Sequence, residues 1–157
     1  MTSTLIAPPG EEPVTLAEAK AFCRIDGSDE DALVNALIAA ARLQVESLTG
    51  RALIAQTWRL TMACAPRLVE LPVIPVAALV AAPAGAVLQS DAVLLVEPVD
   101  ELTVDYTAGY GAAADVPGDL KQAVLTLVAY WYENRDAVTM PPLGFDRLIA
   151  SYKRVRL

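Results

Sequence analysis

The sequence predicts an α+β fold: a mainly α-helical bundle with a small antiparallel β-sheet, in the order helix, helix, strands, helix, followed by an extended C-terminal tail. Apolar residues recur at helical spacing near both ends of the chain and alternate at strand spacing in the middle. The alternating runs are short and are separated by Pro, Gly, Ser and Asp. A chain of 157 residues with 55% hydrophobic residues can bury a core of its own.

We expect a main domain over residues 1–138 and a C-terminal, partner-binding arm over 139–157. Within the domain, the predicted parts are a helical hairpin at 12–50, a β region at 51–110 and a long helix at 116–135. The first helix should run from about Leu16 to Cys23, because Thr15 and Glu18 in "VTLAEAK" have the spacing of a capping box.

The second helix has its own start and stop signals. Ser28 in "GSDEDALV" is the expected N-cap, and the carboxylates that follow it favour the positive end of the helix dipole. Gly50 is the expected C-terminal end, where a left-handed conformation is tolerated. Apolar residues at steps of four and three predict one buried stripe: Val34, Ile38, Ala41, Val45 and Leu48.

After Arg51 the pattern changes from helical to alternating. "ALIAQTWRLTM" places Gln56, Trp58 and Leu60 on one face of a strand, and we expect Trp58 to pack this sheet against the second helix. Further strands are expected at 68–71, 76–80, 93–97 and 102–107. Pro117 is expected as the first residue of the long helix, which continues to about Asn134. A further short helix is expected around 145–150.

Charge excludes several classes of function. The net charge of −7 and pI near 4.5 argue against electrostatic binding of nucleic acid by the chain as a whole, because such binding needs Lys and Arg to neutralise phosphates. The uncharged stretch at 71–90 is long enough to cross a bilayer, but its prolines interrupt a helix, so we expect a buried strand and loop and no membrane contact. Charge is also uneven along the chain, since 91–119 holds seven acids and no base, whereas the tail is basic.

No motif indicates a catalytic, cofactor or metal site. The chain has no His, the commonest general base, and Cys23 and Cys64 lack metal-ligand spacing, so both are expected to be buried thiols. "DGSDED" has oxygen ligands at alternating positions but lacks the Gly and Glu of a calcium loop, and helix capping is the favoured interpretation. "GYGAAA" fits a dinucleotide fingerprint, yet the next helix begins too late, so Gly109 and Gly111 are expected to form a turn.

Aromatic residues suggest a subunit interface. Tyr130, Trp131 and Tyr132 are consecutive in the long helix, so at most two can face one core. Either one is a core residue and the others cover loops, or the outward aromatic contacts a neighbouring subunit. Tyr130, Tyr132 and Arg135 are the candidate interface residues.

The order of these motifs resembles the head-tail connector (adaptor) proteins of tailed bacteriophages and phage-derived gene transfer agents. The resemblance covers most of residues 12–138. It rests on the "TLAEAK" entry, the junction "TGRALIAQTW", the turn "YTAGYG" and the helix end "WYENR". Residues 63–100 and the tail match in general character only.

The resemblance implies a non-enzymatic, structural protein of the virion neck, assembled in the bacterial cytoplasm. It would form a ring with itself, twelvefold like the portal, between the portal protein and a tail completion or stopper protein. The ring would line a channel through which genomic DNA passes without sequence-specific binding. Two other hypotheses stay open from the residues alone: a small acidic cytoplasmic protein-binding module, and an enzyme that uses unpaired carboxylates.

The end of the basic tail is the expected portal-binding element. Its apolar residues are separated by polar ones, as a strand added to a partner's sheet would require. The alternatives are a disordered solubilising end and a strand that returns to the chain's own sheet. The candidate portal-binding residues are Tyr152, Lys153, Arg154, Val155, Arg156 and Leu157.

Overall fold

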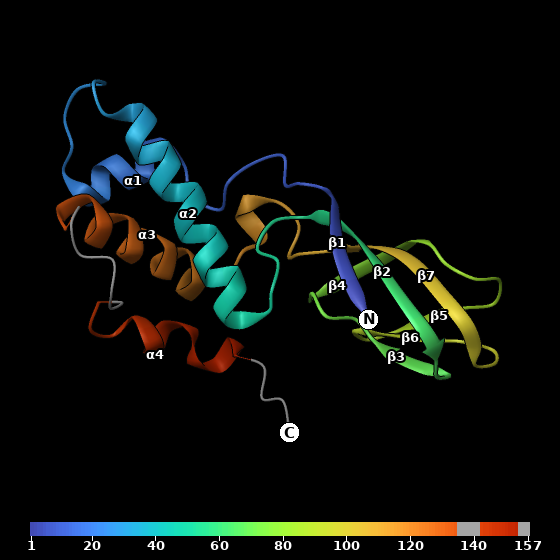
Figure 1. Ribbon diagram of the computed structural model, residues 1–157. Helices are drawn as coiled ribbons and strands as arrows, with labels where there is room; N and C mark the ends of the chain where they lie inside the picture. Colours follow the sequence, from blue (N-terminus) through green and yellow to red (C-terminus); the bar gives the residue numbers. More distant parts are fainter. Residues whose placement is uncertain (135–141, 154–157) are drawn as a thin grey trace.

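The computed structural model describes residues 1–134 and 142–153, and it divides into a helical part and a β part (Figure 1). The helices are α1 (Leu16–Cys23), α2 (Asp31–Thr49), α3 (Gly118–Glu133) and α4 (Phe145–Ile149), with short 3₁₀ turns at Ala113–Asp115 and Ala150–Tyr152. The strands are β1 (Thr2–Ala7), β2 (Gln56–Ala65), β3 (Leu68–Glu70), β4 (Val76–Ala81), β5 (Val87–Gln89), β6 (Ala92–Leu94) and β7 (Val99–Ala108). The mixed α+β class is confirmed, although the β part is larger than expected.

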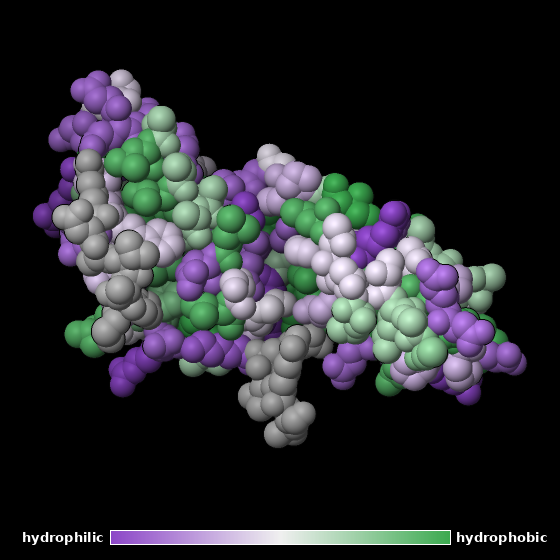
Figure 2. Space-filling view, in the orientation of Figure 1, coloured by the Kyte–Doolittle hydropathy of each residue, from purple (hydrophilic) through white to green (hydrophobic). Residues whose placement is uncertain are grey.

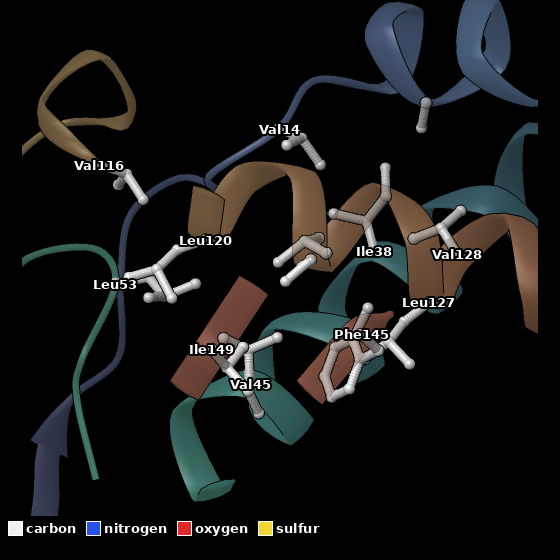
Figure 3. Packing of buried hydrophobic residues seen from close by; sticks show 14 of the residues in the cluster. Val14, Ile38, Val45, Leu53, Val116, Leu120, Leu127, Val128, Phe145 and Ile149 are labelled. Carbon is white, nitrogen blue, oxygen red and sulfur yellow. The ribbon is translucent and has the colours of Figure 1, made fainter. Parts of the chain in front are cut away.

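The helical part has its own core. Apolar residues of α1, α2, α3 and α4 pack together with Leu53 from the segment that enters the β part (Figure 3). Val34, Ile38, Ala41 and Val45 of the predicted stripe are buried here. Leu48, the last residue of the predicted stripe, is 39% exposed. The last buried residue of α2 is its neighbour Thr49.

Local capping explains where the first two helices begin and end. Thr15 and Glu18 form the predicted capping box of α1, with Thr15 N–H donating to Glu18 Oε2 at 2.7 Å. The predicted cap at Ser28 is wrong: Ser28 begins a turn in which its carbonyl accepts from Asp31 N–H at 3.2 Å, so the N-cap of α2 is Glu30, two residues later. Gly50 ends α2 in the left-handed conformation, as predicted.

The β part contains two antiparallel sheets. The larger has the strand order β1-β2-β7-β4, and the smaller has the order β3-β6-β5. Apolar residues of both sheets form a second core, which includes Leu60, Leu102 and Tyr106. Because the two parts have separate cores, the prediction that Trp58 packs the sheet against α2 is wrong. The stripe of α2 packs on α3, and Trp58 is a half-buried residue of the β part.

Two strands and one cysteine depart from the sequence-based expectations. β1 precedes the helices, and β5 extends the smaller sheet, whereas neither strand was expected. Cys64 is exposed and has a positive φ of 52°, at the one position between Ala63 and Ala65 where the pairing of β2 with β7 is interrupted. Cys23 is half-buried, and burial raises the pKa of its thiol. Both thiols are free.

Much of the predicted C-terminal arm belongs to the helical part. The expected short helix is present as α4, where Phe145 and Ile149 lie fully inside the core. This occurs because the two side chains, four positions apart, project from one face of a helical turn. Residues 154–157 lie outside the described part of the chain. None of the described helices is long and apolar enough to cross a membrane.

A glycine turn joins the two parts at close range. Gly109 has φ of 127°, and a Cβ on it would lie 2.4 Å from the carbonyl oxygen of Ile54. Its N–H donates to Pro75 O at 2.8 Å, while Ala55 N–H donates to Gly111 O at 2.9 Å. The "GYG" segment is therefore a turn against the backbone of the junction, and α3 begins only at Gly118.

We predict that Gly109→Ala lowers the free energy of unfolding by at least about 2 kcal/mol, because it adds both a backbone clash and a strained φ. Gly118→Ala is the matched control: a Cβ added there would have nothing within 4 Å, and the φ of Gly118 is not positive. Urea denaturation of both variants measures the difference. Equal stability of the two variants would contradict the close packing at Gly109.

Candidate functional site

The candidate site is a groove between the helical part and the β part. It has a volume of about 370 Å³ and is lined by Leu5 and the two prolines after β1, by one face of α2, and by the start of β2 with Trp58. Leu43 is exposed at its rim, and the indole N–H of Trp58 is buried without a partner among the described residues. A groove with these features is suited to contact with another protein chain.

A polar cluster around Glu46 closes the inner end of this groove. The carboxylate accepts from Leu53 N–H at 2.9 Å and from Gln56 Nε2 at 3.1 Å. Arg42 donates from Nη1 to Glu46 at 2.9 Å and from Nε to Glu12 at 2.8 Å. One carboxylate on α2 thus binds both the chain leaving the helix and the first residue of β2.

Burial and the neighbouring groups shift the pKa values of Glu46 and Arg42. Burial raises the pKa of the Glu46 carboxyl, although the Leu53 N–H and the charge of Arg42 pull it down. Burial also lowers the pKa of the Arg42 guanidinium, but the hydrogen bond and charge of Glu12 and the charge of Glu46 outweigh it, so the pKa lies above its usual range. The ion pair persists because each charge has hydrogen-bonded partners.

Arg51 connects the junction to the C-terminal residues. Its Nε donates to Tyr152 O at 3.1 Å, its Nη1 donates to Tyr110 Oη at 3.2 Å, and its guanidinium lies over the Tyr152 ring at 5.7 Å. Tyr152 is therefore half-buried against the helical part, and burial raises the pKa of its phenol. Lys153 is more exposed and pairs with Asp146 at 2.9 Å.

The predicted site residues are not brought together in one place. Tyr152 and Lys153 lie at the end of the described chain, while Arg154, Val155, Arg156 and Leu157 lie outside the described residues. Tyr130 and Tyr132 are half-buried near the end of α3, and the hydroxyl of Tyr132 donates to Glu30. Trp131 packs against the helical core. Arg135 also lies outside the described residues.

The acids of 91–119 are divided over the molecule. Three of the seven have internal partners: Asp91 accepts from Val76 N–H, Asp115 from Ala112 N–H, and Asp105 from both Nε and Nη2 of Arg59 at 2.7 Å. The Arg59 guanidinium lowers the pKa of Asp105. The other four are exposed, near the start of β7 and the first turn of α3: Glu97, Asp100, Glu101 and Asp119. In the described ranges, no three His, Cys, Asp or Glu residues gather as metal ligands.

The sequence contained little signal for the Glu46 and Arg51 contacts. Arg51 and Tyr152 are 101 positions apart, so no local spacing links them. Glu46 lies in a helix and Gln56 in a strand, so neither the helical nor the strand spacing of residues predicts their hydrogen bond. β1 could have been found, because its six residues carry no charge and include β-branched residues.

A family model places the chain among known proteins. The model described as "Phage gp6-like head-tail connector protein" matches residues 13–142. This range includes both parts of the fold and all of the groove except Leu5, Pro8 and Pro9. No curated protein sequence is significantly similar to the chain.

Solved structures give similar chains. One lies in the neck of an empty GTA particle computed with C6 symmetry, and it is 26% identical with a TM-score of 0.89. Two others, each 26% identical with a TM-score of 0.83, lie in the virion of a native gene transfer agent (GTA) particle and in the neck of a native GTA particle computed with C12 symmetry. Each match covers 100% of this chain and 97% of the other.

We predict that Glu46→Ala lowers the free energy of unfolding by about 3–5 kcal/mol, because it leaves the buried Leu53 N–H and Gln56 amide without their acceptor and removes one of the two carboxylates that pair with the buried Arg42. Glu46→Gln should cost less, since its amide oxygen can still accept from Leu53 N–H. Glu133→Ala, on the exposed end of α3, is the control and should leave stability unchanged within about 0.5 kcal/mol. Chemical denaturation measures all three, and a neutral Glu46→Ala would show that the cluster does not join the two parts.

Proposed function

The chain belongs to the phage gp6-like head-tail connector family, and from this premise we propose how it acts. It is a structural protein of the virion neck. Copies of the chain form a ring between the portal of the DNA-filled head and the tail, and this ring lines the channel through which DNA leaves. The role is one of assembly, and no chemical reaction is assigned to it.

One observation carries the proposal: the whole chain superposes on a neck protein with a TM-score of 0.89, over 100% of its own length and 97% of the other. The agreement therefore includes the β part and the C-terminal helix as well as the three main helices. The similar chains belong to necks computed with C6 and C12 symmetry, which supports a ring and favours twelve copies.

The portal and a tail completion or stopper protein are the proposed partners on the two sides of the ring. The segment from Tyr152 onward is the proposed portal contact, because it adds positive charge to a chain of net charge −7. Arg51 fixes the carbonyl of Tyr152, so the basic residues follow an anchored point. Tyr130, Tyr132 and Arg135 remain the proposed contacts to the neighbouring subunit, with Tyr130 the stronger of the two tyrosines since Tyr132 already bonds Glu30.

The charge of the ring supports passage of DNA without capture. Exposed acids such as Asp100, Glu101 and Asp119 repel phosphates, and the net charge of −7 opposes capture of a duplex. We propose that such acids face the channel and keep the genome mobile.

The function is tested by particles made without this chain. DNA-filled heads should accumulate unattached to tails, and the chain supplied in trans should restore tailed particles, as counted by electron microscopy. Tailed particles at normal yield without the chain would overturn the proposal and favour a cytoplasmic binding module.

We predict that deletion of residues 154–157 leaves the melting temperature unchanged and removes the chain from particles. The double charge reversal Arg154→Glu with Arg156→Glu should do the same, because electrostatic attraction to the portal is lost. Arg147→Glu is the control, since it reverses an exposed charge on α4 outside the proposed contact. Mass spectrometry of purified particles measures incorporation, and normal incorporation of the deletion variant would contradict the assignment.

A further inference from the structure

The larger sheet ends in two strands that are each paired on one side only within the described residues. β1 pairs with β2, and β4 pairs with β7. An unpaired strand edge presents free N–H and C=O groups to any strand that approaches it. The two edges of this sheet are therefore the places where a second chain could add hydrogen bonds.

Both edges come from stretches of the chain that carry no charge. Residues 1–10 and 71–90 contain no Asp, Glu, Lys or Arg, although 20% of the chain is charged. β1 reads "TSTLIA" and β4 reads "VAALVA". Soluble proteins commonly protect strand edges with charged side chains or Pro, and neither β1 nor β4 contains such a residue. In an acidic chain, this exclusion of charge favours contact between like copies.

Apolar side chains are exposed along the same strands. Leu5 and Ile6 of β1 are 39% and 46% exposed, and Val80 of β4 is 61% exposed. Figure 2 shows hydrophobic surface over β1. Five of the six residues of β1 are exposed, so the strand buries little to offset the entropy of ordering it. A second strand at its free edge would supply the missing stabilisation.

Strand direction determines which edges can meet in a ring. Every neighbouring pair in the order β1-β2-β7-β4 is antiparallel, so β1 and β4 run in opposite directions. A copy related by rotation about an axis along the strands keeps the direction of each strand. Its β1 therefore meets β4 of its neighbour in antiparallel orientation, and the alternation continues from one copy to the next.

We propose that β1 of one copy pairs antiparallel with β4 of the next copy, so that the larger sheets form a continuous belt around the ring. The inference rests on the proposed function. It is a head-to-tail contact, the type of contact that closes rings. The contact is placed at 77–81 of β4, because Val76 N–H is already bonded to Asp91.

The dimensions are compatible with a neck. Four strands spaced about 4.8 Å apart occupy about 19 Å, so twelve copies would close a circle about 70 Å across. The register of β4 on β7 shifts at two places, between Val76 and Ala78 and between Leu79 and Ala81. Such irregularities bend and twist a strand, which a sheet that curves from copy to copy requires.

Cysteine crosslinking within assembled particles tests the contact. Thr4→Cys on β1 and Val80→Cys on β4 are combined in a chain whose two native cysteines, Cys23 and Cys64, are replaced by Ala and Ser, and particles are treated with a short bismaleimide crosslinker. The double variant should give a ladder of covalent oligomers on a denaturing gel. The two single-cysteine variants are the controls and should remain monomeric, because each interface then carries one thiol.

Two results would overturn the inference. One is the double variant present in the neck at normal amount without crosslinks above the controls. The other is dimers from a single-cysteine variant, which would show that like strands pair. Loss of the wild-type chain from the neck would instead remove the proposed function, so the two failures are distinguishable.

A charge exchange gives an independent measurement. In the antiparallel register that places Thr4 opposite Val80, Ile6 lies opposite Ala78. Ile6→Lys or Ala78→Lys alone should reduce incorporation into particles by about tenfold or more, because each places an unpaired charge in the apolar contact at every interface. Ile6→Lys combined with Ala78→Glu should restore incorporation, since opposite charges then meet across the strands. Melting temperatures of the purified variants should match the wild type. Full incorporation of either single Lys variant, or no rescue by the pair, would count against β1–β4 pairing.

Discussion

A carboxylate that is mostly buried, with a side chain 13% exposed, connects the two parts of this protein. Glu46 lies on α2, yet it accepts hydrogen bonds from the main chain of Leu53 and the side chain of Gln56, and it pairs with Arg42. The helical part and the β part have separate cores, so burial of apolar surface alone does not set their relative placement. The position of the groove and the separation of the proposed contacts both depend on this cluster.

Two of the four stretches on which the family resemblance rests lie at the same junction. In "TGRALIAQTW", Gly50 ends α2, Arg51 binds the carbonyl of Tyr152, Leu53 enters the helical core and Gln56 reaches Glu46. In "YTAGYG", Gly109 lies against the backbone of that segment, and Gly111 O accepts from Ala55 N–H. These two stretches thus lie where the helical part and the β part contact each other through their main chains.

Structural features that depend on neighbouring residues were predictable from the sequence, whereas contacts between residues far apart in the chain were not. The capping box of α1, the end of α2 at Gly50 and the alternation of β2 depend on neighbouring residues, and all were predicted. The cap at Ser28 failed because a turn competes for the same residues. Three features depend on residues far apart in the chain: the division into two cores, the role of Glu46 and the burial of Phe145. The spacing of apolar residues along the sequence therefore did not predict them.

The turn at Gly109 determines how motion passes through the molecule. There the main chain of one part lies directly on the main chain of the other, with no side chain between them and hydrogen bonds on both sides. Backbone in such contact has no rotamers through which to relax, so we expect the two parts to move together as one body. A small displacement at the tip of the sheet would then rotate the helices at the other end.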